Sequence, residues 1–301
     1  MKNIHLKARA KINLSLDVLN KRPDGYHEVE MIMQQINLYD EIRLFERDVN
    51  EIRILTGCKF IPTNATNIAY KAAELMKESY SIDKGVDIYI KKNIPVAAGL
   101  AGGSTNAASV INGLNRMWRL GLSLKERMDL GIKIGADVPF CIMGGAALAE
   151  GIGERLTPIN SLKNVWFLVS KPSISVSTAD VYSQLELTKI MERPDNKLLL
   201  TAMEKEDIVT ISKNMKNVLE TVTETKYNDI KNIKRKMIEY NALGSMMSGS
   251  GPTVFGIFKN HKRGKAAYNN LSKLYKQTFL VQSYYGRNED EQSTEFKDRK
   301  L

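Results

Sequence analysis

Apolar and polar residues alternate near the start of the chain. Every second position from 12 to 18 is apolar, namely Ile12, Leu14, Leu16 and Val18. Successive side chains of a β-strand point to opposite faces, so this pattern predicts a strand with one buried face. Lys11 and Asn13 fall between the apolar positions, and we expect them to share the opposite face.

A turn and further strands follow this first strand. Arg22-Pro-Asp-Gly25 is a turn signal, because proline presets its own φ and glycine accepts the geometry at the end of the turn. The pattern then predicts strands at residues 29–38, 41–45 and 52–55. We therefore expect the chain to begin with strands joined by short turns.

Helical spacing of apolar residues appears next. Residues 67–77 are predicted to form a helix with Thr66 as a candidate N-cap, and residues 86–90 alternate as a strand. From Ser104 onward apolar residues recur at helical spacing. Ser123 and Glu126 have the spacing of a capping box, which predicts the start of another helix.

The second half of the chain mixes both kinds of element. Strands are predicted at 146–149, 165–169 and 278–284, and helices at 178–187, within 196–222, around 230–240 and at 262–275. A second glycine-rich turn lies within residues 246–258. Strands and helices do not alternate strictly, so the fold class is predicted to be α+β rather than a doubly wound sheet.

The stretch PVAAGLAGGSTNAA, residues 95–108, is almost bare of large side chains and leads directly into a predicted helix. Small residues let a ligand approach backbone N–H groups, and the start of a helix carries partial positive charge. The stretch therefore predicts an anion site of the kind that binds phosphates. Close packing of a helix on a strand is the alternative explanation. The Gly-Lys-Ser/Thr ending of a Walker A loop and the G-x-G-x-x-G fingerprint are both missing from it.

Composition narrows the class of partner. The 301 residues carry a formal net charge of +10, which suggests nucleic acid or a ligand with several phosphates. Basic residues are dispersed rather than gathered in a stripe with aromatic residues, so nucleic-acid binding is not expected. No apolar run is long enough for a membrane span, no signal peptide is evident, and Cys58 and Cys141 form no disulfide framework. A cytoplasmic protein is expected.

Four stretches together with the bare loop resemble one family. ARAKINLSLDVLNKRPDGYHEV, GADVPF, AEGIGERLTPI and MSGSGPTVFGIF occur in the order found in the GHMP small-molecule kinases. The resemblance implies a two-lobed α+β fold with the active site in the cleft between the lobes. It implies an N-terminal ATP-binding domain at residues 1–160, a C-terminal domain at 161–287 and, outside the family pattern, a charged tail at 288–301 that we expect to be disordered.

The first of these stretches and GADVPF are most similar to family members that phosphorylate a cytidine diphosphate derivative of a sugar alcohol in non-mevalonate isoprenoid biosynthesis. The resemblance therefore implies ATP and Mg²⁺ as co-substrate and cofactor, and a small molecule as partner. A homoserine or mevalonate kinase-like activity is the alternative. Tyr26 and His27 disfavour it, because neither of those substrates carries a base on which a ring can stack.

The resemblance also assigns roles to residues. Asp137 would accept or orient the proton of the substrate hydroxyl, and Lys11 would neutralise charge beside it. ATP would contact Asn67 and the loop residues Pro95, Val96, Ala97, Ala98, Gly99, Leu100, Ala101, Gly102, Gly103, Ser104 and Thr105. The substrate would contact Asn13, Tyr26, His27, Thr178, Tyr182, Gly249, Ser250 and Gly251. Without the resemblance, Asp137 would be taken for a turn or cap residue and Lys11 for an exposed strand lysine.

The loop departs from the family pattern at three positions. Ala97, Ala98 and Ala101 stand where many members have glycine. Alanine leaves room for a phosphate but takes positive φ only at a cost, so we expect the loop to follow its own path. Metal ligands are not evident, and Ser104 is the one candidate, because Mg²⁺ bound to phosphates keeps water ligands.

Overall fold

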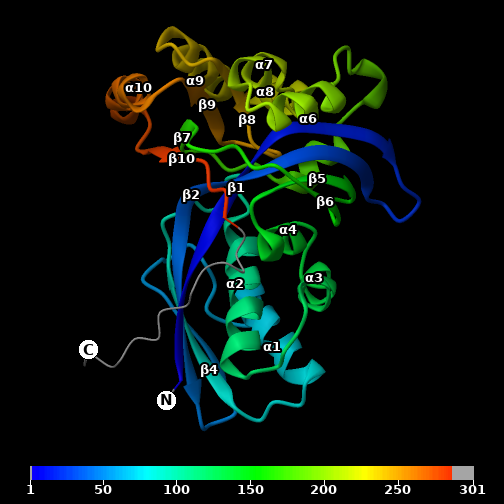
Figure 1. Cartoon of the computed structure of the whole chain (residues 1–301), viewed down its shortest axis with the longest axis vertical. Coiled ribbons are helices and arrows are strands. Elements are labelled where there is room, and N and C mark those ends of the chain that lie inside the picture. Colours follow the sequence, from blue (N-terminus) through cyan, green and yellow to red (C-terminus); the bar gives the residue numbers. More distant parts are fainter. Residues whose placement is uncertain (1, 287–301) are drawn as a thin grey trace.

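Two β-sheets with helices packed on them form the protein (Figure 1), which a computed structural model describes at residues 2–286. One sheet has the strand order β3-β4-β2-β5-β6, with β1 paired to β2. The other has the order β10-β7-β9-β8. Figure 1 shows helices α1 to α4 in the lobe of the first sheet and α6 to α10 in the lobe of the second. The two-lobed α+β architecture is confirmed.

A long antiparallel hairpin of β1 (Asn3–Lys21) and β2 (His27–Arg47) runs through the middle of the molecule. Its turn is the predicted one, with the N–H of Gly25 donating to the carbonyl of Arg22 at 3.1 Å and Gly25 at φ +88°. The predicted strands at 29–38 and 41–45 are one continuous strand. Pairing on both of its sides, with β1 along its length and with β4 and β5 in part, holds β2 extended across both segments.

Strand β1 is buried on both faces from Ala8 to Val18, so the prediction of a single buried face is wrong. Leu14, on the face expected to be buried, packs in one hydrophobic cluster with Phe167 of the second lobe. Lys11, on the other face, lies against Asp137 of the first lobe and is only 4% exposed.

Four further strands complete the first sheet. These are β3 (Ile52–Leu55), β4 (Gly85–Lys91), β5 (Ala146–Gly151) and β6 (Arg155–Ile159), and β3 pairs with β4 in parallel. Strand β6 was missed, because its sequence RLTPI alternates weakly and contains proline. It pairs with β5 at the edge of the sheet, where proline is tolerated.

Helices α1 (Ile68–Ser79), α2 (Gly102–Met117), α3 (Leu124–Ile132) and α4 (Val138–Met143) pack in the first lobe. The cap of α1 is Asn67, whose Oδ1 accepts from the N–H of Ala69 at 2.9 Å. The expectation that Thr66 is the cap is wrong, because its hydroxyl instead donates to Asn64. The capping box of Ser123 and Glu126 is confirmed at the start of α3.

The apolar run after Asp137 divides into two elements. Gly144 and Gly145, both at positive φ, separate α4 from β5. Sequence periodicity did not reveal α4, because all six of its residues are buried and no polar face marks the helix. Asp137 is thereby placed at the first turn of a helix packed under α2.

The second lobe contains the strands β7 (Trp166–Lys171), β8 (Gly244–Met247), β9 (Val254–Phe258) and β10 (Gln277–Gln282). Its helices are α5 (Thr178–Ser183), a 3₁₀ turn (Leu187–Lys189), α6 (Asn196–Glu204), α7 (Ile208–Asn214), α8 (Glu220–Lys226), α9 (Asn228–Glu239) and α10 (His261–Leu274). Helix α5 is shorter than predicted, since the chain leaves it at Gln184 before forming the separate 3₁₀ turn.

The proposed domain boundary at residue 160 falls in the connection between β6 and β7 and stays a prediction. The tail at 288–301, for which disorder was expected, lies outside the described residues. Within residues 2–286, no helix has the length and apolar character needed to cross a membrane.

Candidate active site

A cleft of about 900 Å³ lies between the two lobes. Most of the residues predicted for the site line it, from the hairpin, the bare loop, the start of α4, helix α5 and the second glycine-rich turn. Four predicted residues do not line it, namely Asn13, Leu100, Thr105 and Gly251. The sequence therefore predicted most of the residues that line the cleft.

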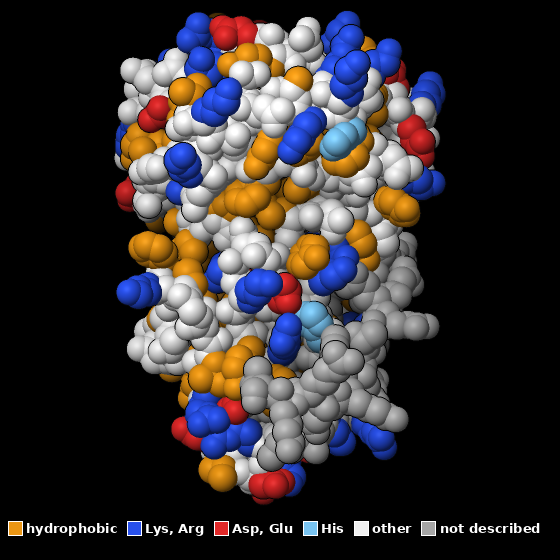
Figure 2. All heavy atoms as spheres, turned by 90° about the vertical axis from the view of Figure 1, so that its left-hand side faces the viewer, with side chains coloured by type: hydrophobic (Ala, Val, Ile, Leu, Met, Phe, Trp, Pro, Cys, Tyr) orange, Lys and Arg blue, Asp and Glu red, His pale blue; other side chains and the backbone are white. Residues whose placement is uncertain are grey.

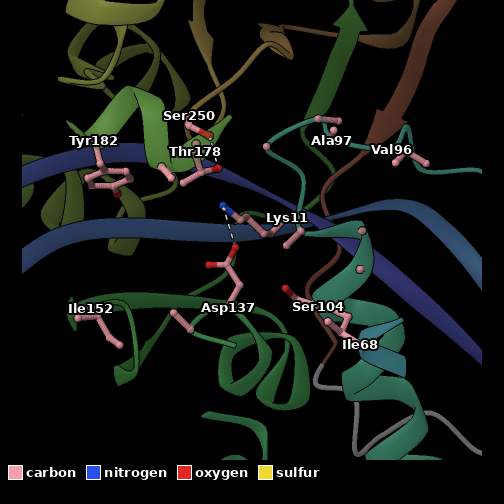
Figure 3. A pocket seen from close by; sticks show the side chains of 18 of the residues that line it. Lys11, Ile68, Val96, Ala97, Ser104, Asp137, Ile152, Thr178, Tyr182 and Ser250 are labelled. Carbon is pink, nitrogen blue, oxygen red and sulfur yellow. Dashed lines mark hydrogen bonds and ion pairs between the residues drawn. The ribbon is translucent and has the colours of Figure 1, made fainter. Parts of the chain in front are cut away.

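Lys11 and Asp137 face each other across the cleft (Figure 3), with Nζ of Lys11 3.7 Å from Oδ2 of Asp137. Nζ of Lys11 also donates to Oδ1 of Asn13 at 2.8 Å, as the shared strand face predicted. Asp137 occupies the N-cap position of α4 but makes no side-chain capping bond. Its carboxylate is 32% exposed and is free to meet a ligand beside the buried ammonium.

The bare loop wraps over the start of α2. The N-cap residue of α2 is Ala101, no side chain caps the helix, and Gly102 and Gly103 of its first turn line the cleft. Ala97 and Ala101 adopt φ of 50° and 56°, and Gly99 adopts 70°. Alanine thus accepts the left-handed conformation at two of the three substituted positions, contrary to the simple expectation. This arrangement can hold an anion against the positive end of a helix.

A buried carboxylate that the sequence analysis missed anchors the beginning of this loop. Oδ1 of Asp40 accepts from the N–H groups of Asn93 and Ile94 at 2.7 and 2.8 Å. Its Oδ2 pairs with the ammonium of Lys92, which lines the cleft. Asp40 falls between the strands predicted at 29–38 and 41–45, and no pattern in the sequence identified its partners.

The second glycine-rich turn contacts the bare loop. Oγ of Ser248 donates to the carbonyl of Gly99 at 3.0 Å, and a Cβ at Gly99 would lie 2.2 Å from the backbone oxygen of Ser248. A Cβ at Gly249 would lie 3.6 Å from Nζ of Lys11. Nδ2 of Asn217 supports the turn by donating to the carbonyls of Met247 and Gly249. The turn is therefore held beside both the loop and the lysine.

Aromatic rings form the other end of the cleft. The rings of His27 and Tyr182 lie 5.1 Å apart at 41°, and Tyr26 is 59% exposed at the mouth. Burial, and then the charge of Lys21, hold the pKa of His27 below its usual value of 6.5. A neutral imidazole can both donate and accept a hydrogen bond, which suits contact with the edge of a base.

The hydroxyl groups on the cleft and behind it have distinct partners. Oγ1 of Thr178 lies 2.8 Å from Oγ of Ser250, which joins α5 to the second glycine-rich turn. Thr105 is 1% exposed and is hydrogen-bonded to Cys141 beneath the loop, while Ser104 lines the cleft. Burial raises the pKa of the Cys141 thiol, so this cysteine is an inert packing partner of Thr105.

No cluster of three or more His, Cys, Asp or Glu side chains suited to a metal ion occurs within residues 2–286. Asp137 is the one acidic residue among the described residues that line the cleft. This donor set fits a cation held mainly by ligand phosphates and water, for which few protein ligands are needed.

Comparisons with known proteins agree with this geometry. The GHMP kinases N terminal domain family matches residues 67–145, and the GHMP kinases C terminal family matches residues 199–277. A 4-diphosphocytidyl-2-C-methyl-D-erythritol kinase from Alkaliphilus metalliredigens is 64% identical over 291 residues, which are 97% of this chain and 100% of the relative. The chain belongs to this family of GHMP kinases. A relative of the same name from Clostridioides difficile is 53% identical over 93% of this chain and 95% of its own length.

Solved structures of GHMP kinases have the same fold. A 4-(cytidine 5'-diphospho)-2C-methyl-D-erythritol kinase superposes with a TM-score of 0.79 at 30% identity, covering 94% of this chain and 100% of that chain. A homoserine kinase from Cytophaga hutchinsonii gives 0.75 at 18% identity, covering 96% of both chains. As a member of the GHMP kinases, the chain is an enzyme and an ATP-dependent kinase. Lys11, Tyr26 and His27 precede residue 67, outside both matched segments.

Proposed function

We propose that this GHMP kinase transfers the γ-phosphoryl group of ATP to the 2-hydroxyl of 4-diphosphocytidyl-2-C-methyl-D-erythritol. The observation that carries the proposal is the position of the Lys11–Asp137 pair. It lies between the bare loop at the start of α2 and the aromatic rings of His27 and Tyr182. A phosphate donor on one side and a cytidine group on the other would meet at this pair.

The reaction forms a bond between the substrate oxygen and the γ-phosphorus and breaks the bond from that phosphorus to the β–γ bridging oxygen. ADP leaves with the bonding electrons, and the hydroxyl proton passes to the carboxylate of Asp137 or is oriented by it. The ammonium of Lys11, fixed by Asn13, stabilises the negative charge that spreads over the transferred group. Asn13 thus acts through Lys11.

ATP would bind with its phosphates against the N–H groups at the start of α2, from Gly102 to Ser104. Mg²⁺ would be held by the phosphates and water, with the Ser104 hydroxyl as the candidate protein ligand on the cleft, and it would supply further charge neutralisation. Of the other loop residues predicted to bind ATP, Leu100 acts through its backbone, and Thr105 supports α2 from behind.

The cytosine would bind at the aromatic end. Tyr26 would stack on one face, Tyr182 would bound the slot, and His27 would hydrogen-bond to the base edge. The Thr178–Ser250 pair and the N–H groups of the turn at Gly249 are available to the substrate diphosphate. A mevalonate or homoserine kinase-like activity leaves this end of the cleft without a ligand.

A small molecule is the proposed partner, without nucleic acid or membrane. On the face in Figure 2, Lys and Arg side chains are dispersed among uncharged and hydrophobic groups. Nucleic-acid binding requires a continuous basic track. We also propose a cytoplasmic location, which is supported by Cys58 and Cys141, neither of which forms a disulfide.

The test is ADP release by the purified protein with ATP and Mg²⁺. The acceptors are 4-diphosphocytidyl-2-C-methyl-D-erythritol, its uridine analogue, mevalonate and homoserine. Release with the cytidine compound alone is the expected result, since a site built on base-edge hydrogen bonds rejects a base that leaves them unpaired. Equal release with the uridine analogue would remove His27 from base recognition, and release only with mevalonate or homoserine would overturn the substrate.

A further inference from the structure

The outer half of the β1–β2 hairpin, residues 15–32, extends beyond Lys11 and lies against the second lobe (Figure 1). The register of the hairpin shifts after Asn13, as it does at a β-bulge. Lys11 lines the cleft before the shift and Leu16 lines it afterwards, although a separation of five residues places side chains on opposite faces of a regular strand. The shift thereby leaves Asp17 on the side away from the cleft, against the second lobe.

Arg193, in the connection between the 3₁₀ turn and α6, binds this side of the hairpin. Its Nη1 donates to Oδ1 of Asp17 at 2.5 Å and to the carbonyl of Val18 at 2.9 Å. The N–H of Val18 donates to the same carboxylate oxygen at 2.8 Å. One nitrogen of the guanidinium therefore joins the second lobe to both the side chain and the backbone of β1.

The carboxylate of Asp17 depends on this guanidinium because it is buried. The residue is 6% exposed, and burial raises the pKa of Asp17, whereas the charge of Arg193 opposes that rise. Glu30, its partner across the hairpin, adds a second negative charge and raises the pKa further. Hydrogen bonds between charged groups are stronger than neutral ones, and a buried charge that loses its partner is strongly destabilising. Arg193 thus makes a strong and specific attachment.

Asn196, the first residue of α6, adds a second attachment nearer the base of the outer half. Its Oδ1 accepts from Oγ of Ser15 at 2.5 Å, and its Nδ2 donates to Oε1 of Glu30 at 2.6 Å. Oγ of Ser15 in turn accepts from the N–H of Ile32 at 3.0 Å. Both strands of the hairpin are therefore bound to the second lobe at this level.

The tip of the hairpin carries the rings proposed to bind cytosine. Tyr26 and His27 follow the turn, and the ring of His27 lies against Tyr182 of α5. Within residues 2–286, no hydrogen bond or ion pair joins residues 19–28 to the second lobe. Arg193 therefore makes the outermost polar contact between the hairpin and that lobe. The separation of the hairpin rings from α5 depends on it.

We propose that Arg193 is a positioning residue, which holds the tip of the hairpin at the separation from α5 that cytidine recognition requires. It does not line the cleft, so it acts through its bonds to β1 rather than by contact with a ligand. A slot between two elements binds a base tightly only if its walls are already fixed, because binding must otherwise also order them. The inference rests on the proposed function, because it takes the aromatic end of the cleft as the cytidine site.

Calorimetric titration of cytidine 5'-diphosphate into enzyme saturated with ADP tests the assignment. We expect Arg193→Gln to bind this probe about tenfold more weakly than the unmodified enzyme, which corresponds to the loss of one charged hydrogen bond. Affinity for ADP should be unchanged, because the loop that we expect to hold it is fixed elsewhere. Arg193→Lys should retain most of the affinity for the probe, since a single nitrogen makes both bonds and an ammonium can replace it.

Two further variants separate positioning from a general loss of structure. Glu192→Gln is the matched control, because this neighbouring carboxylate pairs with Lys216 and not with the hairpin, and it should bind the probe normally. Asp17→Asn/Arg193→Gln removes both charges, so it leaves no isolated carboxylate in the protein interior and tests the proposal even if Arg193→Gln does not fold. The double variant should show the same loss of about tenfold. Normal affinity in it would assign the defect to the isolated charge and overturn the inference.

Turnover supplies the second readout. In Arg193→Gln, KM for the cytidine substrate should rise by the same factor as the dissociation constant of the probe, with kcat and KM for ATP retained. Equal weakening toward the probe and ADP would indicate a general structural role and overturn the inference. Unchanged affinity for the probe would overturn it as well while leaving the proposed function intact. Failure of the unmodified enzyme to bind the probe would instead overturn the proposed cytidine site and this inference with it.

Discussion

The backbone N–H of Lys11 donates to the carbonyl of Leu100 at 3.2 Å. The strand that carries the proposed catalytic ammonium is therefore hydrogen-bonded to the loop that we expect to hold the phosphates. The loop is also fixed to the second lobe through Gly99 and Ser248. Catalytic positioning depends on such fixed relative placement of the reacting groups.

Substitution of Asp137 can separate its contribution to turnover from its contribution to nucleotide binding. We expect Asp137→Asn to lower kcat by about 10²–10⁴-fold, the range for loss of a general acid–base group. ATP binding should be unchanged, because Lys11 keeps its bond to Asn13. Single-turnover kinetics and nucleotide titration measure the two effects. Turnover near that of the unmodified enzyme would remove Asp137 from the proton transfer.

The contact between the bare loop and the second glycine-rich turn can be tested by substitution of Gly99. Gly99→Ala adds a Cβ 2.2 Å from the Ser248 oxygen at φ +70°, and we expect a loss of about 2–5 kcal/mol in unfolding free energy. Gly121→Ala is the matched control, with φ +69° but nothing within 4 Å. It should cost only about 1–2 kcal/mol. Denaturant unfolding measures both, and equal losses would show that the contact is not tight.

The alanines at positive φ are predicted to carry strain. Ala97→Gly removes the strain of a left-handed alanine, which stabilises the folded protein by about 1–2 kcal/mol. Glycine also raises the conformational entropy of the unfolded chain, which lowers the stability by about 0.4–1 kcal/mol. We expect a net gain of about 0–1.6 kcal/mol in unfolding free energy. Ala98→Gly, at a buried position that is not in the left-handed region, should instead destabilise. Equal stabilities of these two variants would contradict the assignment of strain to Ala97.

His27 should respond to the charge of Lys21, its partner across the hairpin. Lys21→Gln removes a positive charge, so the pKa of His27 should rise toward 6.5, as followed by NMR titration. Because that pKa is lower in the folded than in the unfolded protein, the unfolded protein binds more protons just below pH 6.5, and stability increases with pH there. Lys21→Gln brings the pKa of His27 in the folded protein closer to its unfolded value, so the pH range over which stability increases should become narrower. Lys125→Gln, which removes a charge paired with Asp129, should leave the His27 titration unchanged.

Local sequence signals predicted the parts of the site that local geometry determines. The period of two placed Lys11 beside Asn13, and small residues before a helical pattern marked the loop at the start of α2. Asp40 was missed, because its role depends on partners that the fold brings from another part of the chain. The cap of α1 was misplaced by one residue, since Thr66 and Asn67 are both good caps and tertiary contacts decide between them.

The burial of β1 between the lobes has a consequence for the order in which the chain can mature during synthesis. The strand that carries Lys11 is synthesised well before Lys216 and Val218, which supply the backbone partners of Leu16. The strand stays incompletely paired until residues 216–218 have been made, so a nascent N-terminal lobe exposes an apolar strand that later synthesis covers. Truncated products ending before residue 216 should therefore be recognised as unfinished and degraded.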